Sequence, residues 1–322
     1  MNIELYRSPS FDPYVNLGVE ETLLETCPAD TLRFYLWQNA NTVVIGKNQH
    51  APSEVALDKL IQDDGKLARR SSGGGAVYHD LGNLNFTFIL DEAHYDVKKQ
   101  MHVIARALQS LGYNAIVSGR NDIEIDGAKV SGNAFLQRSG FGLHHGTILH
   151  SVNKEKLGMY LTVSEAKLKR KHVESIKARI VNLNDLKTIS LDEVIQACLN
   201  AVSLEYGVIG SPMPFPIESS QDKIEFFKSE DWLYGKHFDQ RLKLDTYLSF
   251  GSIRWEFESI DGYITQSVIY TDAMDVQWIQ RICDLIIGVK ADPQSIADRL
   301  ETVDENDVML HELIAWLRGE LQ

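Results

Sequence analysis

Arg-Arg-Ser-Ser-Gly-Gly-Gly-Ala-Val-Tyr-His-Asp-Leu-Gly-Asn-Leu-Asn, residues 69–85, is the stretch that decides how this chain is interpreted. Its three consecutive glycines allow a tight turn and let another molecule approach the backbone N–H groups closely. Two arginines precede them, and each carries a permanent planar charge that suits phosphate. Polar side chains crowd around the glycines: Ser71, Ser72, His79, Asp80, Asn83 and Asn85. The stretch therefore predicts an anion site.

Two common nucleotide-binding motifs do not fit this stretch. A P-loop has a Lys-Ser/Thr pair that opens a helix after its last glycine. Here Ala76, Val77 and Tyr78 follow, and they are typical of a strand. A Rossmann motif needs separated glycines between a strand and a helix. We therefore expect phosphates to be held by a strand–turn–strand loop.

Composition narrows the class of protein. The chain has 322 residues, of which 44% are hydrophobic, and its formal net charge is −13. An acidic balance argues against non-specific binding of nucleic acid. No apolar run reaches the length of a membrane span, and the first residues do not resemble a signal peptide. Cys27, Cys198 and Cys283 are too far apart to suggest a disulfide framework or a zinc site. We expect a cytoplasmic protein without membrane contact.

The order of the expected elements indicates two α+β parts. The first part mixes strands and helices without a regular βαβ rhythm. A proline-rich segment at residues 211–216 interrupts it, because prolines remove backbone donors. The dipeptides Asp126-Gly127 and Asp261-Gly262 each predict a tight hairpin turn. We expect a first domain at residues 1–245 and a second at residues 246–322. Strands are expected at residues 3–7, 34–37, 42–45, 85–90, 123–125, 128–131, 143–149, 248–258 and 263–270, and helices after Asp12, Asp96 and Asp275, at 191–204 and from 304 on.

Lys129 follows the first of these hairpin turns. Alone, a lysine there is more often a surface residue. Asn121 and Asp122 precede the hairpin, however, and oxygen ligands of this kind suit Mg²⁺. His144 and His145 lie in a later strand, where neighbouring side chains leave on opposite faces. The two histidines are therefore not expected to chelate one metal together, and each could equally be a core or surface residue.

These motifs together resemble the bacterial lipoate–protein ligase A family. The resemblance rests on residues 69–85, 119–122, 129–134, 144–149 and 175–183, and in the second part on residues 250–253 and 261–264. It covers nearly the whole chain in order. The fold that it implies is the α+β fold of biotin and lipoate ligases, related to class II aminoacyl-tRNA synthetases. In that fold a mixed-sheet catalytic domain is followed by a small C-terminal α+β accessory domain.

The resemblance also implies a two-step reaction. ATP and lipoate give lipoyl-AMP and pyrophosphate with Mg²⁺, and the acyl group then passes to a lysine of a lipoyl domain. Such domains belong to 2-oxo acid dehydrogenase complexes and to the glycine cleavage H protein. Residues 167–187 carry seven basic and two acidic side chains. The family has an adenylate-covering loop that corresponds to residues 171–182.

The resemblance assigns roles to individual residues. Lys129 matches the lysine that contacts both the lipoyl carboxyl group and the α-phosphate. The nucleotide contacts map to Arg70, Gly75, Ala76, Val77, Tyr78 and Asn83, the lipoate site to Arg70, Ser72, Lys129, His145 and Trp37, and Mg²⁺ to Asp122. Val44 and Leu17 are further candidates for an apolar slot, in which each buried CH₂ contributes about 0.8 kcal/mol.

Three other functions compete with this interpretation. An acyltransferase that works through a thioester needs a nucleophilic cysteine, and the motifs lie between Cys27 and Cys198, where no cysteine occurs. A biotin–protein ligase would carry a different phosphate loop. A lipoate-binding protein without catalytic activity would not need Lys129, Arg70 and Asp122 together. Release of pyrophosphate would separate an enzyme from such a binder.

Overall fold

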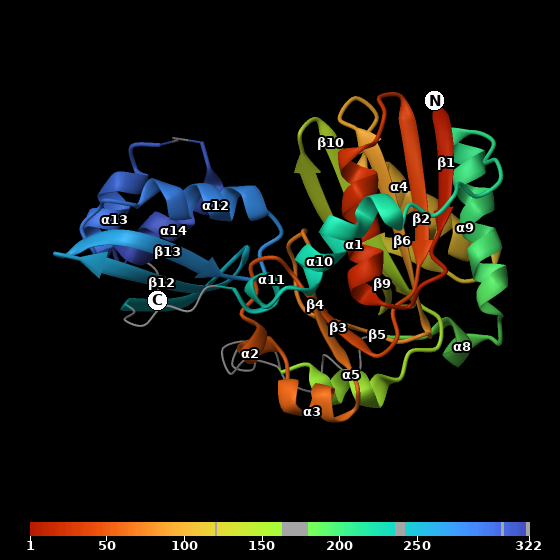
Figure 1. The fold of residues 1–322 in the computed structure, drawn as a ribbon, viewed down its shortest axis with the longest axis horizontal. Helices are drawn as coiled ribbons and strands as arrows, with labels where there is room; N and C mark the ends of the chain where they lie inside the picture. Colours follow the sequence, from red (N-terminus) through yellow and green to blue (C-terminus); the bar gives the residue numbers. More distant parts are fainter. Residues whose placement is uncertain (120, 163–179, 236–241, 304–305, 320–322) are drawn as a thin grey trace. The chain divides into compact units, whose positions relative to one another are not determined.

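A computed structural model describes residues 1–119, 121–162, 180–235, 242–303 and 306–319. The chain forms two compact units, which are described separately (Figure 1). The first contains residues 1–45, 51–70 and 76–233, and the second contains residues 46–50, 71–75 and 234–322. Both units combine strands and helices, so the predicted α+β class is confirmed. Within the described ranges, no helix has the length and apolar character needed to cross a bilayer.

A mixed seven-stranded sheet is the centre of the first unit. The edge strand β1 runs parallel to its neighbour β2, and every other neighbouring pair is antiparallel. In spatial order the strands are β1 (Asn2–Arg7), β2 (Thr31–Trp37), β6 (Asn83–Asp91), β10 (Phe141–Leu149), β9 (Ala128–Arg138), β8 (Asp122–Ile125) and β7 (Ala115–Ser118).

Helices cover both faces of this sheet (Figure 1). On one face, α4 (Val97–Ser110) and α9 (Leu191–Tyr206) bury the apolar core, which includes Phe34, Phe86 and Phe88. The Asp96 side chain accepts from the Lys99 amide and caps α4, as the sequence predicted. On the other face lies α1 (Pro13–Glu25), which Asp12 caps. The remaining helical segments of this unit are α2 (Ala51–Glu54), α3 (Leu57–Gln62), α5 (Lys154–Tyr160), α8 (Leu183–Leu186), η1 (Glu218–Ser220), α10 (Gln221–Lys228) and α11 (Glu230–Tyr234).

A small second sheet carries the ends of the glycine-rich loop. Its strand order is β4 (Lys66–Arg69), β3 (Thr42–Ile45) and β5 (Val77–His79). The loop therefore leaves one strand and enters another, as predicted. Arg69 does not serve as a free phosphate ligand, because its guanidinium donates to the carbonyl oxygens of Trp232 and Leu233. Trp232 Nε1 donates to the Arg69 carbonyl in return, so hydrogen bonds of this arginine link α11 to β4.

The Asp126-Gly127 turn connects β8 and β9 as predicted. Both residues have positive φ, 50° and 81°, which a type I′ turn requires. The pairing shifts by one residue between Ile123 and Glu124. This bulge changes which residues of β9 lie opposite Asp122 and brings the register to Asp122 opposite Gly132.

The second unit packs a three-stranded antiparallel sheet against helices. The sheet contains β11 (Leu242–Leu248), β12 (Gly251–Ile260) and β13 (Tyr263–Tyr270), and Trp255 lies fully buried in its core. The sequence predicted a two-stranded hairpin that begins at residue 248, so β11 is an additional strand. The helices are α12 (Val276–Leu285), α13 (Pro293–Leu300) and α14 (Val308–Leu317), of which α13 was not predicted.

The three glycines of the loop are part of the second unit. The Gly74 amide donates to the Ala273 carbonyl, and the Lys47 amide donates to the Ser72 carbonyl. A Cβ atom on Gly73 would come within 2.4 Å of the Met274 carbonyl oxygen. Residues 71–75 therefore pack against Ala273 and Met274, which lie about 200 positions later in the sequence.

Candidate active site

Alternate residues of the large sheet build a polar surface under α1. Tyr35 and Trp37 of β2 face α1, whereas Phe34 and Leu36 point into the core on the opposite side. This follows from the two-residue period of a strand. The surface is unusual, because a sheet face that is covered by a helix normally carries apolar side chains.

Strand register aligns two predicted site residues, Trp37 and Asp122, with polar residues between them in one row across this surface. Trp37 pairs with Asn85, and Asn85 pairs with Thr147. The Gly132 amide then donates to Thr147 Oγ1 at 3.1 Å, and Gly132 pairs with Asp122. The row crosses four strand spacings, roughly 19 Å. It therefore joins Trp37 at one end to Asp122 at the other.

Lys129 lies at the Asp122 end of this row. Its Nζ atom is 2.7 Å from Asp122 Oδ1. A Cβ on Gly132 would come within 2.8 Å of the Lys129 Cε and Nζ atoms, so the missing side chain makes room for the lysine. The lysine side chain keeps 34% of its surface exposed. The carbonyl of Lys129 accepts from the Val181 amide, so the segment that begins at residue 180 lies beside this lysine. Most of the predicted covering loop, residues 171–179, lies outside the described residues.

A buried hydrogen-bonded chain organises the Trp37 end. Trp37 Nε1 donates to Thr87 Oγ1, and Thr87 donates to Glu20 Oε1 at 2.6 Å. His145 Nδ1 lies 3.0 Å from both carboxylate oxygens of Glu20. Glu20 comes from α1 and is 4% exposed. The carboxylate accepts from both neighbours, so it orients the indole and imidazole rings above the row.

The protonation state of His79 follows from its neighbours. Asn16 Nδ2 donates to Asn39 Oδ1, which leaves Asn39 Nδ2 to donate to His79 Nδ1. Burial, together with the charges of Arg70 and His145, lowers the pKa of His79 to about 3. His79 is therefore neutral at pH 7 with its proton on Nε2.

Three buried polar atoms around this site lack partners among the described residues: His79 Nε2, Asn83 Oδ1 and Asn85 Nδ2. The side chains are 3%, 0% and 2% exposed. Leaving a buried donor or acceptor without a partner costs about 1–3 kcal/mol for each group. Two donors and one acceptor without partners in one place are the pattern expected of a site that binds a polar ligand.

Most of the remaining predicted contacts of the first unit lie on or beside the small sheet of β4, β3 and β5. Arg70 is 6% exposed and donates from Nη1 to the Val44 carbonyl. Burial lowers the pKa of its guanidinium to about 10, so the group stays charged at neutral pH. Val77 and Tyr78 pair with β3, and the Tyr78 hydroxyl donates to Asn41. Ala76 precedes them. Val44 and Leu17, the two other apolar candidates, are fully buried.

Ser72 and Gly75 belong to the second unit. The Ser72 carbonyl accepts from the Lys47 amide, and the side chain of Ser72 is fully buried. A Cβ on Gly75 would meet no atom within 4 Å. The Gly75 backbone is therefore open on the side where a side chain would stand, which suits close approach of a ligand.

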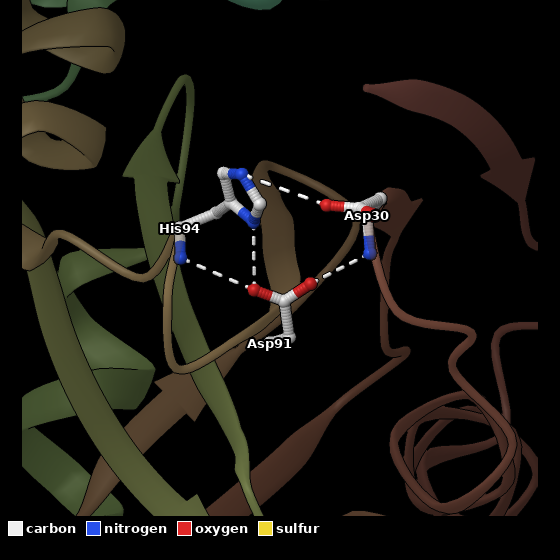
Figure 2. A group of neighbouring side chains, drawn as sticks. All are labelled: Asp30, Asp91 and His94. Carbon is white, nitrogen blue, oxygen red and sulfur yellow. Dashed lines mark hydrogen bonds and ion pairs between the residues drawn. The ribbon is translucent and has the colours of Figure 1, made fainter.

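The one group of three metal-ligand side chains within the described ranges lies elsewhere (Figure 2). It contains Asp30, Asp91 and His94. Burial raises the pKa of Asp91, but hydrogen bonds from the Asp30 amide and from His94 outweigh it and lower the pKa overall. Asp91 is six residues beyond Asn85 on β6, or about 20 Å along the strand. This group is therefore separate from the row that ends at Lys129.

The three cysteines are buried thiols. Burial raises the pKa of Cys27 to about 11, of Cys198 to about 12 and of Cys283 to about 11. A thiol with a raised pKa carries almost no thiolate at neutral pH and is a poor nucleophile. None of the three takes part in the row from Trp37 to Asp122.

Sequence reasoning missed several members of this site. Glu20, Thr87 and Thr147 were not assigned, and His79 and Asn85 were noticed only as polar neighbours of the glycines. Two signals could have revealed them. Glu20 and Glu21 lie between the apolar residues Val19 and Leu23 of α1, and Asn85 and Thr87 occupy alternate positions of a buried strand.

Models of two protein domains match the chain. The lipoyl protein ligase A/B catalytic domain matches residues 12–203. The bacterial lipoate protein ligase C-terminus matches residues 238–317. The first match alone covers more than half of the chain.

Two curated proteins resemble the chain over nearly its whole length. A lipoate–protein ligase A of Blochmanniella pennsylvanica is 36% identical over 307 residues, which cover 92% of this chain and 91% of that protein. A lipoate–protein ligase A of Psychrobacter cryohalolentis is 32% identical, and the match covers 100% of both chains.

Solved structures share the fold. P. falciparum LipL1 in complex with lipoate superposes with a TM-score of 0.85 at 26% identity and covers 99% of both chains. A lipoate–protein ligase A bound with ATP gives a TM-score of 0.64 at 26% identity, covering 73% of this chain and 98% of that one. A bipartite lipoate protein ligase of Thermoplasma acidophilum, studied with its E2 lipoyl domain, superposes with a TM-score of 0.65 at 27% identity. The match covers 74% of this chain and 98% of that one.

Proposed function

Because this chain belongs to the lipoate–protein ligase A family, we propose that it joins lipoate to a lysine of lipoyl domains in an ATP-dependent reaction. The observation that carries the proposal is the row from Trp37 to Lys129. An indole ring at one end of the row and a cation at the other suit an acid with an apolar tail and a reactive carboxylate. The relatives described above bind lipoate and ATP, which supports the same substrates here.

In the first step a carboxylate oxygen of lipoate attacks the α-phosphorus of ATP. The new O–P bond forms as the bond to the β-phosphate oxygen breaks, and pyrophosphate leaves. Charge grows on the α-phosphate oxygens, and Lys129 is the cation proposed to stabilise it. Fixed donors of this kind contribute about 10²–10³ in rate. Arg70 and the backbone of residues 75–78 are proposed to hold the nucleotide, with Asn83 as a further ligand.

In the second step the amine of the acceptor lysine attacks the acyl carbon of lipoyl-AMP. AMP leaves, an amide forms, and the amine proton is lost. AMP is a good leaving group, so this step needs no thiol on the enzyme. We propose that lipoyl domains of 2-oxo acid dehydrogenase complexes or the glycine cleavage H protein supply the lysine. The archaeal relative studied with an E2 lipoyl domain supports a partner of this class.

Trp37, His145, Ser72 and Arg70 are the proposed lipoate ligands, and Glu20 and Thr87 orient two of them. The Glu20 carboxylate holds the His145 ring, and Thr87 links it to the Trp37 indole. Each methylene of the substrate tail that is buried adds about 0.8 kcal/mol. Chain length should therefore be selected more strongly than the dithiolane ring.

The Asp122 carboxylate is the proposed protein ligand of Mg²⁺. Mg²⁺ commonly binds one or two protein carboxylates together with substrate phosphates and water. Asp122 is 31% exposed at the end of the row, where the phosphates would lie. When bound there, the ion would neutralise phosphate charge. A cytoplasmic location remains a prediction from the sequence.

A thioester transferase is the main competing proposal, and the raised pKa values of all three cysteines weigh against it. The experiment that separates the proposals is pyrophosphate release with lipoate, octanoate or biotin as the acid. Release that needs lipoate and ATP, followed by modification of a purified lipoyl domain, supports the ligase. Binding of lipoate without release would favour a non-catalytic binder.

A further inference from the structure

His144 lies on the opposite side of β10 from His145, in the apolar core, and the proposed reaction does not use it. It is 0% exposed and its ring stacks on Phe88, with centroids 5.7 Å apart. Phe135 packs on it at 4.9 Å. A fully buried histidine among aromatic rings is costly unless both nitrogens have partners. Both nitrogens of His144 have partners, and one of these partners is hydrogen-bonded to the segment next to Asp122, which pairs with Lys129.

His144 Nε2 lies 2.8 Å from Asn133 Oδ1 on the neighbouring strand β9. The orientation of the Asn133 amide is fixed by its other bonds. Asn133 Nδ2 donates to the Asn121 carbonyl at 3.0 Å, and a carbonyl can only accept. Asn133 therefore presents its oxygen to His144, and His144 must donate from Nε2.

Burial lowers the pKa of His144 to about 3, so the ring is neutral and carries one proton. With that proton on Nε2, Nδ1 must accept. The amide of Gln100 lies 2.9 Å from Nδ1, and turning it by 180° places its NH₂ group there. Before this amide flip, Gln100 Nε2 has no partner among the described residues. The flip therefore also places this donor in a hydrogen bond.

Asn133 connects this histidine to the end of the substrate row. Its main-chain and side-chain N–H groups both donate to the Asn121 carbonyl, and Asn121 Nδ2 donates back to the Asn133 carbonyl. Asn121 is adjacent to Asp122, whose carboxylate pairs with Lys129. Gly146 leaves the space for the network, since a Cβ there would come within 2.4 Å of Asn133 Oδ1.

We propose that His144 is a positioning residue for Lys129. As a neutral Nε2–H donor it holds the Asn133 amide, which fixes Asn121 and hence Asp122 opposite the lysine. The inference rests on the proposed function, because it assigns the reaction to Lys129. A displacement of about 1 Å at a reacting group costs roughly 10²-fold in rate, so loss of the donor should lower kcat more than substrate binding.

The test compares His144→Leu, which loses the donor, with His144→Gln, whose Nε2 can replace the imidazole Nε2–H. Ile148→Ala, buried on the same strand, controls for lost stability. We expect His144→Leu to lower kcat of lipoyl-AMP formation about 10²-fold with KM values within threefold, and His144→Gln to restore most of it. Equal rates for His144→Leu and Ile148→Ala, or equally low rates for both His144 variants, would overturn the proposal.

A second measurement does not depend on the variants folding. Long-range ¹H–¹⁵N spectra of the unaltered protein at pH 7 should show His144 as the neutral Nε2–H tautomer. An Nδ1–H tautomer or an imidazolium would contradict the inference. Absence of lipoate-dependent pyrophosphate release from the unaltered protein would instead contradict the proposed function.

Discussion

Lys129 Nζ and Asp122 Oδ1 lie 2.7 Å apart on neighbouring strands, above a glycine that leaves room for the lysine. The ion pair holds the lysine ammonium beside the Asp122 carboxylate. A phosphate or carboxylate that enters the row meets a cation whose position is already defined. Such preorganisation lowers the cost of ordering the group when charge develops in the reaction.

Lys129→Ala is therefore expected to lower the rate of lipoyl-AMP formation by about 10²–10³-fold and to leave the fold intact. Lys154→Ala is a matched control, since Lys154 is similarly exposed and pairs with Asp185 at 2.6 Å. Pyrophosphate release and thermal unfolding measure both effects. Adenylate formation by Lys129→Ala at the unaltered rate would remove this lysine from the mechanism.

A protein with Cys27, Cys198 and Cys283 all changed to serine should keep ligase activity. The reason is that the acyl group is activated by AMP, and the buried thiols have raised pKa values. Stability should fall by about 1 kcal/mol for each site, so the assay needs folded protein. If that protein makes lipoyl-AMP but no longer modifies the lipoyl domain, a thioester step is required after all.

Acid should destabilise the protein through its buried histidines. The pKa of His79 and of His144 is lowered to about 3 in the folded state, so between pH 6.5 and 3 the unfolded state binds more protons. Stability then falls as pH decreases, by about 2 kcal/mol for each histidine from pH 7 to pH 5. Urea unfolding at pH 7 and pH 5 measures this change. The free energy of unfolding of His144→Gln should fall less than that of the unaltered protein, by about the contribution of one histidine.

The exposed His102 on α4 provides the control for this pH effect. His102→Gln removes an exposed imidazole and is the comparison variant for the loss of stability between pH 7 and pH 5. An unchanged loss in His144→Gln would show that His144 does not titrate differently in the two states.

Gly73→Ala should disturb the glycine-rich loop more than Gly75→Ala does. A Cβ on Gly73 would lie 2.4 Å and 2.5 Å from the carbonyl oxygens of Met274 and Ala273, whereas a Cβ on Gly75 meets open space. Overpacking of this kind costs about 1–3 kcal/mol. Thermal unfolding measures the difference, and equal midpoints for the two variants would contradict the packing.

The same contacts make the second unit relevant to adenylation. Residues 71–75 pack with residues of that unit, so a chain cut near Asp245 would lose the support of this loop. We expect such a truncation to impair lipoyl-AMP formation more than transfer from added lipoyl-AMP. Full adenylation by the truncated chain would show that the loop holds its geometry without this support.

Local patterns predicted much of this fold. The Asp126-Gly127 turn, the Asp12 and Asp96 caps and the opposite orientations of His144 and His145 all follow from a few neighbouring residues. The extra strand β11 and helix α13 were missed. β11 alternates apolar and polar residues only over Leu242 to Leu248, and α13 begins at an Asp-Pro pair whose capping signal was overlooked.

Long-range pairing limited what the sequence could predict about the site. Trp37 meets Asn85 and Glu20 meets His145 only through strand register and helix placement, which neighbouring residues do not encode. The same limit explains the interpretation of Arg69 as a phosphate ligand. Its partners, Trp232 and Leu233, are more than 160 residues away.

The measurement that tests the central claim most directly is formation of lipoyl-AMP by the unaltered protein from lipoate and ATP, followed by addition of a purified lipoyl domain. The account predicts pyrophosphate release that depends on lipoate, an isolable lipoyl-AMP, and a lipoylated lysine once the domain is added. Lipoylation without ATP, or binding of lipoate and ATP without release of pyrophosphate, would contradict it.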